Sequence, residues 1–174
     1  MTSGPGGASI APPFLGSSYC ASKKLCGIPF FRSMPVALYN LDQIKAAGLS
    51  DKVLPQNWAE LETLLEGLKQ HTHRAPFFLG GEWYDWLFEA TVIQAGGELM
   101  QTKGYKVVLN TPMAERALTF WKRLKDKGLL ERSTVWKDTL TGFTSGRDPV
   151  TYYSSGGMAA VRRNTRFAWL AAMM

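Results

Sequence analysis

The sequence predicts a helix-rich α/β fold. Short apolar strands alternate with helices, and the connections between them are short. The 174 residues are a usual size for one domain, and 45% of them are hydrophobic, which is enough to form a core. Residues 1–26 are rich in Gly, Pro, Ser and Ala, and we expect them to form an irregular leader ahead of the folded residues 27–174.

Four stretches have the composition of short strands. They contain β-branched or aromatic residues and lie beside turn-forming residues. The predicted strands cover residues 36–39, 76–79, 150–153 and 167–174. A polar loop or hairpin is expected around Lys103 and Gly104.

Good N-caps indicate where the helices begin. Asn40, Asn57 and Thr111 precede segments with helical character, and Thr111 is followed by Pro112, which suits a first helical position. Two of these helices carry an apolar stripe at the helical period. The stripes are Trp58, Leu61, Leu64, Leu65 and Leu68 in one helix, and Ala117, Phe120, Trp121 and Leu124 in the other. Further helices are predicted over 82–95 and 139–143 and from Met158.

Charge and cysteine content exclude several classes of function. The net charge is +6, but the basic residues are spread along the chain, so no nucleic-acid partner is predicted. Cys20 and Cys26 have no further ligands at zinc spacing, and they form either a small disulfide loop or two free thiols. His71 and His73 do not share a helix face, so we interpret them as surface residues. No metal or cofactor is predicted.

The sequence gives little indication of an enzyme. It has neither a phosphate-binding P-loop nor a nucleophile elbow. Glu82 and Asp85 are spaced to share a helix face as an acid/base pair, which would suit a small enzyme acting on a sugar phosphate. The alternative, which we favour, is that acidic residues accumulate at the start of a helix because of its dipole.

Two stretches have the composition of a binding surface. Ser154, Ser155, Gly156 and Gly157 form a turn between a strand and a helix, where hydroxyls and backbone N–H groups can meet an anion or a polar oxygen. An ordinary strand-to-helix turn explains the same residues. The second stretch follows Gly80–Gly81, a pair that makes the next turn approachable for a ligand. Aromatic residues there cover most of the circumference of a helix. Part of that helix is therefore expected to line a cavity, unless it is buried on all sides.

Residues 27–167 resemble the extracellular solute-binding proteins of ABC importers, in the branch that binds sugars and glycerol-3-phosphate. The segment 27–40 is similar to the family's "IPF…S-x-P-V-L-Y-Y-N" stretch, and the segment 46–61 to its "AGL…P-x-T-W-x-E-L". Trp83 and Trp86 match a "W-x-x-W" segment, and the segment 143–157 resembles "F-x-x-G-x-A-A-M…S-S-G". The chain departs from that pattern at 148–150, and family members are more than twice its length.

The resemblance implies a fold and a function. The fold would be part of a periplasmic-binding-protein-like structure, in which two α/β lobes close on a ligand. The implied ligand is a sugar, a polyol or a glycerol-3-phosphate-like molecule, and the implied partners are ABC permease subunits. Ligand contacts would come from Ser33, Trp83, Trp86, Ser154, Ser155, Gly156 and Gly157. The implied location is periplasmic or extracellular, although the N-terminus does not have the pattern of a signal peptide. A truncated remnant without activity is the alternative.

Overall fold

The chain forms two compact units, Met1–Met34 and Pro35–Met174. The computed structural model describes residues 15–20, 22–101 and 106–173. Within the described part of the first unit lie a short 3₁₀ turn, η3 (Gly16–Ser18), and a disulfide between Cys20 and Cys26. The sequence alone left open whether these two cysteines form a disulfide or stay free thiols, and the structure shows the disulfide. The boundary expected at residue 26 lies inside this first unit.

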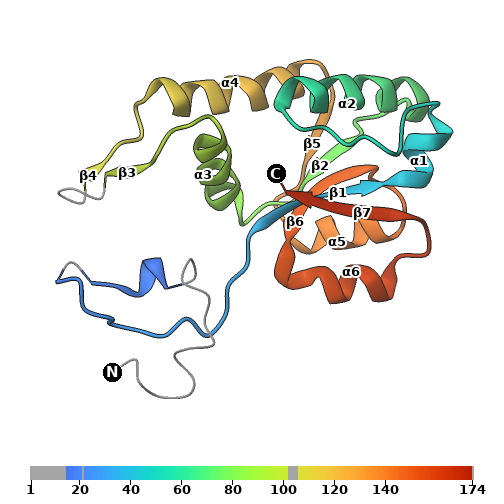
Figure 1. Ribbon diagram of the computed structural model, residues 1–174. Coiled ribbons are helices and arrows are strands. Elements are labelled where there is room, and N and C mark those ends of the chain that lie inside the picture. Colours follow the sequence, from blue (N-terminus) through green and yellow to red (C-terminus); the bar gives the residue numbers. More distant parts are fainter. Residues whose placement is uncertain (1–14, 21, 102–105, 174) are drawn as a thin grey trace. The chain divides into compact units, whose positions relative to one another are not determined.

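The second unit is built on a five-stranded sheet with the order β5-β2-β6-β1-β7 (Figure 1). β2 pairs in parallel with both β5 and β6, whereas β1 pairs antiparallel with β6 and β7. The bounds are β1 (Pro35–Asn40), β2 (Phe77–Leu79), β5 (Leu130–Arg132), β6 (Val150–Ser154) and β7 (Trp169–Met173). The α/β prediction and the four expected strands are confirmed, but the sequence analysis missed β5.

The helices of the second unit begin largely where their caps predict. The side chains of Asn40, Asn57 and Thr111 each accept a hydrogen bond from a backbone N–H in the first helical turn. The helices are α1 (Leu41–Ala46), α2 (Trp58–Thr72), α3 (Tyr84–Gln94), α4 (Pro112–Asp126), α5 (Lys137–Thr144) and α6 (Met158–Asn164), with a 3₁₀ turn η4 (Ser155–Gly157) before α6.

The predicted start of α3 at residue 82 is wrong. Glu82 has a φ of +69°, outside the helical region, and Trp83 is the N-cap. The sequence missed this because the carboxylate of Glu82 looks like a first-turn acid. In the structure a bend at residues 81–82 precedes the helix, which begins at Tyr84, two residues later than predicted.

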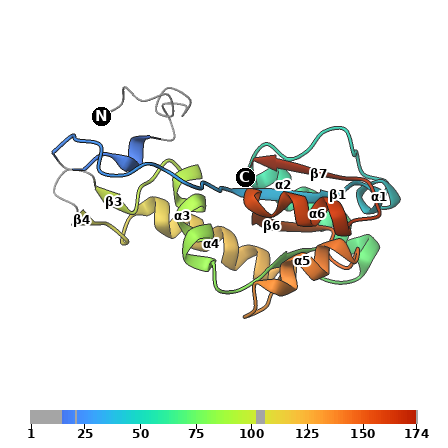
Figure 2. The same cartoon turned by 90° about the horizontal axis from the view of Figure 1, so that it is seen from below.

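The sheet separates two apolar clusters, because side chains alternate between its faces. Ala37, Tyr39 and Tyr152 face the larger cluster, which includes the buried leucines of α2 and α4. Leu38 and Tyr153 face the smaller one, with apolar residues of α5 and α6. Figure 1 shows α2 and α4 on one side of the sheet and α5 and α6 on the other, and Figure 2 views the α5/α6 side.

A two-stranded hairpin, β3 (Met100–Gln101) with β4 (Lys106–Val107), connects α3 to α4. It agrees with the expected polar hairpin. Its predicted tip, Lys103–Gly104, lies outside the described residues.

An ion-pair cluster fastens α2 to α4. Glu62 lies 2.8 Å from both the Arg123 guanidinium and the Lys127 ammonium, and Glu66 lies 2.6 Å from Lys127. Burial raises the pKa of Glu62, but the hydrogen bonds from Lys127 and Arg123 outweigh it and leave that pKa below its ordinary value. The ionised form of Glu62 therefore stabilises the folded state.

We expect Glu62→Gln to lower the free energy of unfolding at neutral pH by about 1 kcal/mol, the upper range for partly exposed pairs. The folded-state pKa of Glu62 is lowered, so the contribution of this carboxylate to stability is fully present above its pKa in the unfolded state, about 4.3. That contribution is lost as the pH falls through the pKa of Glu62 in the folded state. Denaturant unfolding across this range should show a shallower acid decline in the variant. Glu66→Gln, which removes a more exposed carboxylate, is the control; equal pH profiles for wild type and Glu62→Gln would contradict the account.

Candidate ligand-binding site

The three parallel strands end along one edge of the sheet. The last residues of β2, β5 and β6 are Leu79, Arg132 and Ser154. Ligands of open α/β sheets bind outside the carboxyl ends of such strands, because the loops that follow them converge there. We therefore call this side the carboxyl edge, and it is formed by the segments 80–83, 133–136 and 154–157.

Four aromatic rings lie next to one another along the carboxyl edge. The ring centres of Trp86 and Trp83 are 5.6 Å apart, and those of Trp83 and Trp136 are also 5.6 Å apart. Trp136 in turn stacks on Tyr153 at 5.1 Å with an angle of 7° between the planes. We call these residues the aromatic row. Trp83 is 45% exposed, so it presents an indole surface to solvent.

The aromatic row continues to the serine-glycine turn. A β-carbon added at Gly157 would lie 2.3 Å from Cε1 of Tyr153, so the Tyr153 ring fills the space beside this glycine. The structure thus brings Trp83 and Trp86, predicted from one stretch of sequence, together with the turn predicted from another. Trp136 and Tyr153 connect them.

One part of the turn differs from the expected arrangement. The Gly156 N–H donates to Ser154 Oγ at 3.2 Å, so that amide and that hydroxyl already bond to each other. The Ser154 hydroxyl accepts in this bond and keeps its own proton to donate. Ligand contacts from Ser154, Ser155, Gly156 and Gly157 stay predictions.

Gly80 and Gly81 have a different role from the predicted one. We expected them to let a ligand approach, but both are buried. A β-carbon at Gly81 would lie 2.5 Å from the backbone of Thr134, and one at Gly80 would lie 1.9 Å from Thr139 Oγ1. The glycines therefore admit the segment 133–136, which carries Trp136 to Trp83.

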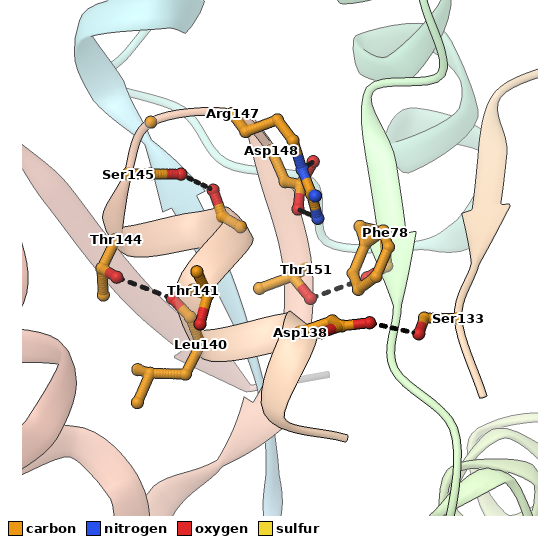
Figure 3. Close-up of polar contacts among 12 residues, drawn as sticks. Phe78, Ser133, Asp138, Leu140, Thr141, Thr144, Ser145, Arg147, Asp148 and Thr151 are labelled. Carbon is orange, nitrogen blue, oxygen red and sulfur yellow. Dashed lines mark hydrogen bonds and ion pairs between the residues drawn. The ribbon is translucent and has the colours of Figure 1, made fainter. Parts of the chain in front are cut away.

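Hydrogen bonds hold that segment in place. The Tyr84 hydroxyl donates to Ser133 O at 2.5 Å, and burial, opposed by the charge of Arg132, raises the pKa of Tyr84 and keeps its proton in place. Ser133 Oγ donates to Asp138 Oδ2 at 2.5 Å (Figure 3). The same Oγ accepts from the Val135 N–H at 3.0 Å. The loop is thus tied both to α3 and to the start of α5.

A family model described as "Bacterial extracellular solute-binding protein" matches residues 7–170. The chain belongs to this family. The match confirms the resemblance inferred from the motifs. It begins at residue 7 and so includes most of the segment 1–26, in which we recognised no motif of the family.

Individual relatives agree with this membership. The sn-glycerol-3-phosphate-binding periplasmic protein UgpB of Escherichia coli O1:K1 / APEC is 27% identical over 171 residues, which are 93% of this chain and 39% of that protein. UgpB of Yersinia pestis bv. Antiqua (strain Antiqua) is 25% identical over 175 residues, 95% of this chain and 39% of that protein. The chain therefore spans 39% of the length of these two curated relatives.

Solved structures show the same fold. UgpB from Mycobacterium tuberculosis, in complex with glycerophosphocholine, matches with a TM-score of 0.82 at 22% identity, covering 96% of this chain and 43% of that one. The GacH receptor of Streptomyces glaucescens, solved unliganded and with acarbose, matches with a TM-score of 0.82 at 21% identity, and the match covers 97% of this chain and 44% of that one. The expected fold, part of a solute-binding protein, is confirmed.

Three arginines of the second unit lie apart from the carboxyl edge. Arg147 pairs with Asp148 at 2.8 Å ahead of β6, at the opposite end of that strand, and its hydrogen bond to Asp148 raises the pKa of Arg147 (Figure 3). Arg162 and Arg163 lie in the last turn of α6, away from the turn where that helix begins. Ser33 belongs to the first unit and is exposed there, so its role stays a prediction.

The proposed acid/base geometry is not formed. Glu82 precedes α3 at a positive φ, whereas Asp85 lies in its first turn, so the two do not share one helical face as the spacing predicted. In the described ranges, no three His, Cys, Asp or Glu side chains are grouped as metal ligands would be. Among the helices of those same ranges, none is both long and apolar enough to cross a bilayer.

A cavity of about 740 Å³ lies elsewhere in the second unit. Its lining includes Tyr39 and Tyr152 from the sheet, Trp58 from the start of α2 and Arg116 from α4. None of the predicted ligand contacts lines it. The aromatic row, whose exposed member is Trp83, is therefore separate from this cavity.

We expect Gly81→Ala to lower the free energy of unfolding by about 1–3 kcal/mol, since its methyl group would collide with the Thr134 backbone. The change should appear in denaturant unfolding. Gly67→Ala, within α2, is the control, because its methyl group meets only the flexible end of the Leu49 side chain. If Gly81→Ala is as stable as wild type, the close approach of the segment 133–136 is not as described.

Proposed function

We propose that this chain forms part of the ligand-binding surface of an extracellular solute-binding protein that captures a sugar, a polyol or a glycerol-3-phosphate-like ligand for ABC-type import. The observation that carries the proposal is the aromatic row at the carboxyl edge, with its exposed indole of Trp83. Ligand sites combine apolar and aromatic walls with a few placed polar groups. The row supplies the wall, and the turn 154–157 supplies hydroxyl and amide groups.

The chemistry of the row limits the class of ligand. Indole faces offer a flat apolar surface to the C–H side of a sugar or polyol, and they attract cations such as quaternary ammonium groups. The names of the relatives point the same way, since they mention sn-glycerol-3-phosphate, glycerophosphocholine and acarbose. These compounds share hydroxyl groups, and each carries a feature that suits either the indole surface or the turn.

The partners and the location follow from family membership. An extracellular solute-binding protein delivers its ligand to the permease subunits of an ABC importer, and the curated relatives are named as periplasmic. We propose the same partners and the same location for the protein to which this sequence belongs. The relatives are named for binding, which supports a role that is not enzymatic.

Fluorescence titration tests the proposal. Glycerol-3-phosphate, glycerophosphocholine and maltose are added separately to the folded chain, and tryptophan emission is followed. We expect at least one of them to change the emission in a saturable way. Folded protein that responds to none of the three would contradict the proposed ligand class.

For the responding compound, Trp83→Ala should weaken binding by about 3- to 10-fold, as expected for the loss of one aromatic contact of about 0.5–1.5 kcal/mol. Trp58→Ala is the control, because Trp58 also contacts another aromatic ring, Phe120 at 4.7 Å, but lies in the wall of the separate cavity. Isothermal titration calorimetry measures both affinities. An effect of Trp58→Ala alone would place the ligand in the cavity and contradict the site.

A further inference from the structure

Trp136 occupies the middle of the aromatic row. One of its faces stacks flat on Tyr153, and its ring centre lies 5.6 Å from that of Trp83 at an angle of 51°. It comes from the segment between β5 and α5, whereas Trp83 comes from the segment between β2 and α3. Trp136 is therefore the contact through which a neighbouring loop reaches the exposed indole.

The position of Trp136 is fixed by the elements around it. Tyr153, on which it stacks, is 8% exposed, lies within β6 and is confined by Gly157. The backbone of Trp136 itself lies close to Gly80, where an added β-carbon would be 3.1 Å from Trp136 O. Sheet, turn and loop together leave this indole little freedom.

Trp83 has much less support from its own segment. It follows Glu82, which has a φ of +69°, and as the N-cap of α3 it makes no side-chain capping bond. Its side chain is 45% exposed, and its ring contacts are with Trp86 and Trp136. Trp86 belongs to the helix that Trp83 caps, so of these two ring contacts the one with Trp136 comes from a separate element.

We propose that Trp136 is a positioning residue of the ligand site, which holds the Trp83 indole in the orientation that a ligand stacks on. This inference rests on the proposed function and adds a residue to it. An indole free to rotate loses side-chain entropy when a ligand fixes it, whereas a pre-oriented one does not. The loss of Trp136 therefore weakens binding without removing any group at the exposed surface of Trp83.

The test compares Trp136→Ala and Trp136→Phe in the full chain, with Trp58→Ala as the control for the loss of a stacked indole elsewhere. The probe is whichever of glycerol-3-phosphate, glycerophosphocholine and maltose binds wild type by calorimetry. We expect Trp136→Ala to weaken binding by about 3- to 10-fold, no more than Trp83→Ala, because it can lose at most the contact that it positions. Trp136→Phe keeps a flat ring on Tyr153 and should stay within about 2-fold of wild type, as should Trp58→Ala.

A second readout follows the orientation of Trp83 without a ligand. Coupled indoles give circular dichroism bands that depend on their mutual angle, and the band that is lost in both Trp83→Phe and Trp86→Phe belongs to the Trp83–Trp86 pair, to which the Trp136 ring does not contribute. We expect Trp136→Ala to reduce that band, while Trp58→Ala preserves it. Denaturant unfolding confirms that each variant is folded.

The two readouts separate the failure of this inference from the failure of the proposed function. If no probe binds wild type, the proposed function fails, and a band reduced by Trp136→Ala still supports the positioning of Trp83. If a probe binds and Trp136→Ala is folded with wild-type affinity or an unchanged band, the positioning role is overturned. A loss of affinity that is equal in Trp136→Phe and Trp136→Ala also overturns it, because the flat ring alone should restore the support.

Discussion

The close approach of the segment 133–136 to Gly80 and Gly81 is the contact on which the candidate site depends. A side chain at Gly81 would collide with the backbone of Thr134, so the two loops meet only because this position has no β-carbon. Their meeting brings Trp136 against Trp83, and the parallel register of β2 with β5 and β6 sets both loops at the same edge. The carboxyl edge becomes one continuous surface for that reason.

Apolar clusters on both faces of the sheet support the carboxyl edge. The sheet packs a large apolar cluster on one face and a smaller cluster on the other, so the strands that end at the edge are held from both sides. The ion pairs of Glu62 with Arg123 and Lys127 fasten α2 to α4 over the larger cluster. Tyr153 connects the apolar core to the carboxyl edge, because it is a buried residue of β6 and Trp136 stacks on its ring.

Local signals explain what could be predicted from the sequence. The caps Asn40, Asn57 and Thr111 act within four residues, and the strand 150–153 is an uninterrupted run of β-forming residues, so these elements are visible in the sequence. β5 was missed because Glu131 and Arg132 are exposed, and its strand character comes from pairing with β2. The tryptophan pair and the serine-glycine turn were found from motifs, but their connection through Trp136 and Tyr153 was not visible in the sequence.

The roles that were missed or wrongly assigned depend on contacts distant in sequence. Trp136 stands in a stretch without a motif, and its importance arises only from its neighbours Tyr153 and Trp83. Gly80 and Gly81 were correctly singled out as a place of close approach, but what approaches is the chain itself. In both cases the residue type indicated a tertiary contact, and only the fold could identify its partner.

The most direct measurement of the central claim is a two-dimensional ¹H–¹⁵N spectrum of the six tryptophan indole N–H groups, recorded while the ligand that binds is added. If the aromatic row at the carboxyl edge is the ligand surface, the resonances of Trp83 and Trp86 shift in proportion to occupancy. The resonance of Trp58, in the wall of the separate cavity, should stay in place. A shift of Trp58 with Trp83 and Trp86 unchanged would contradict the account.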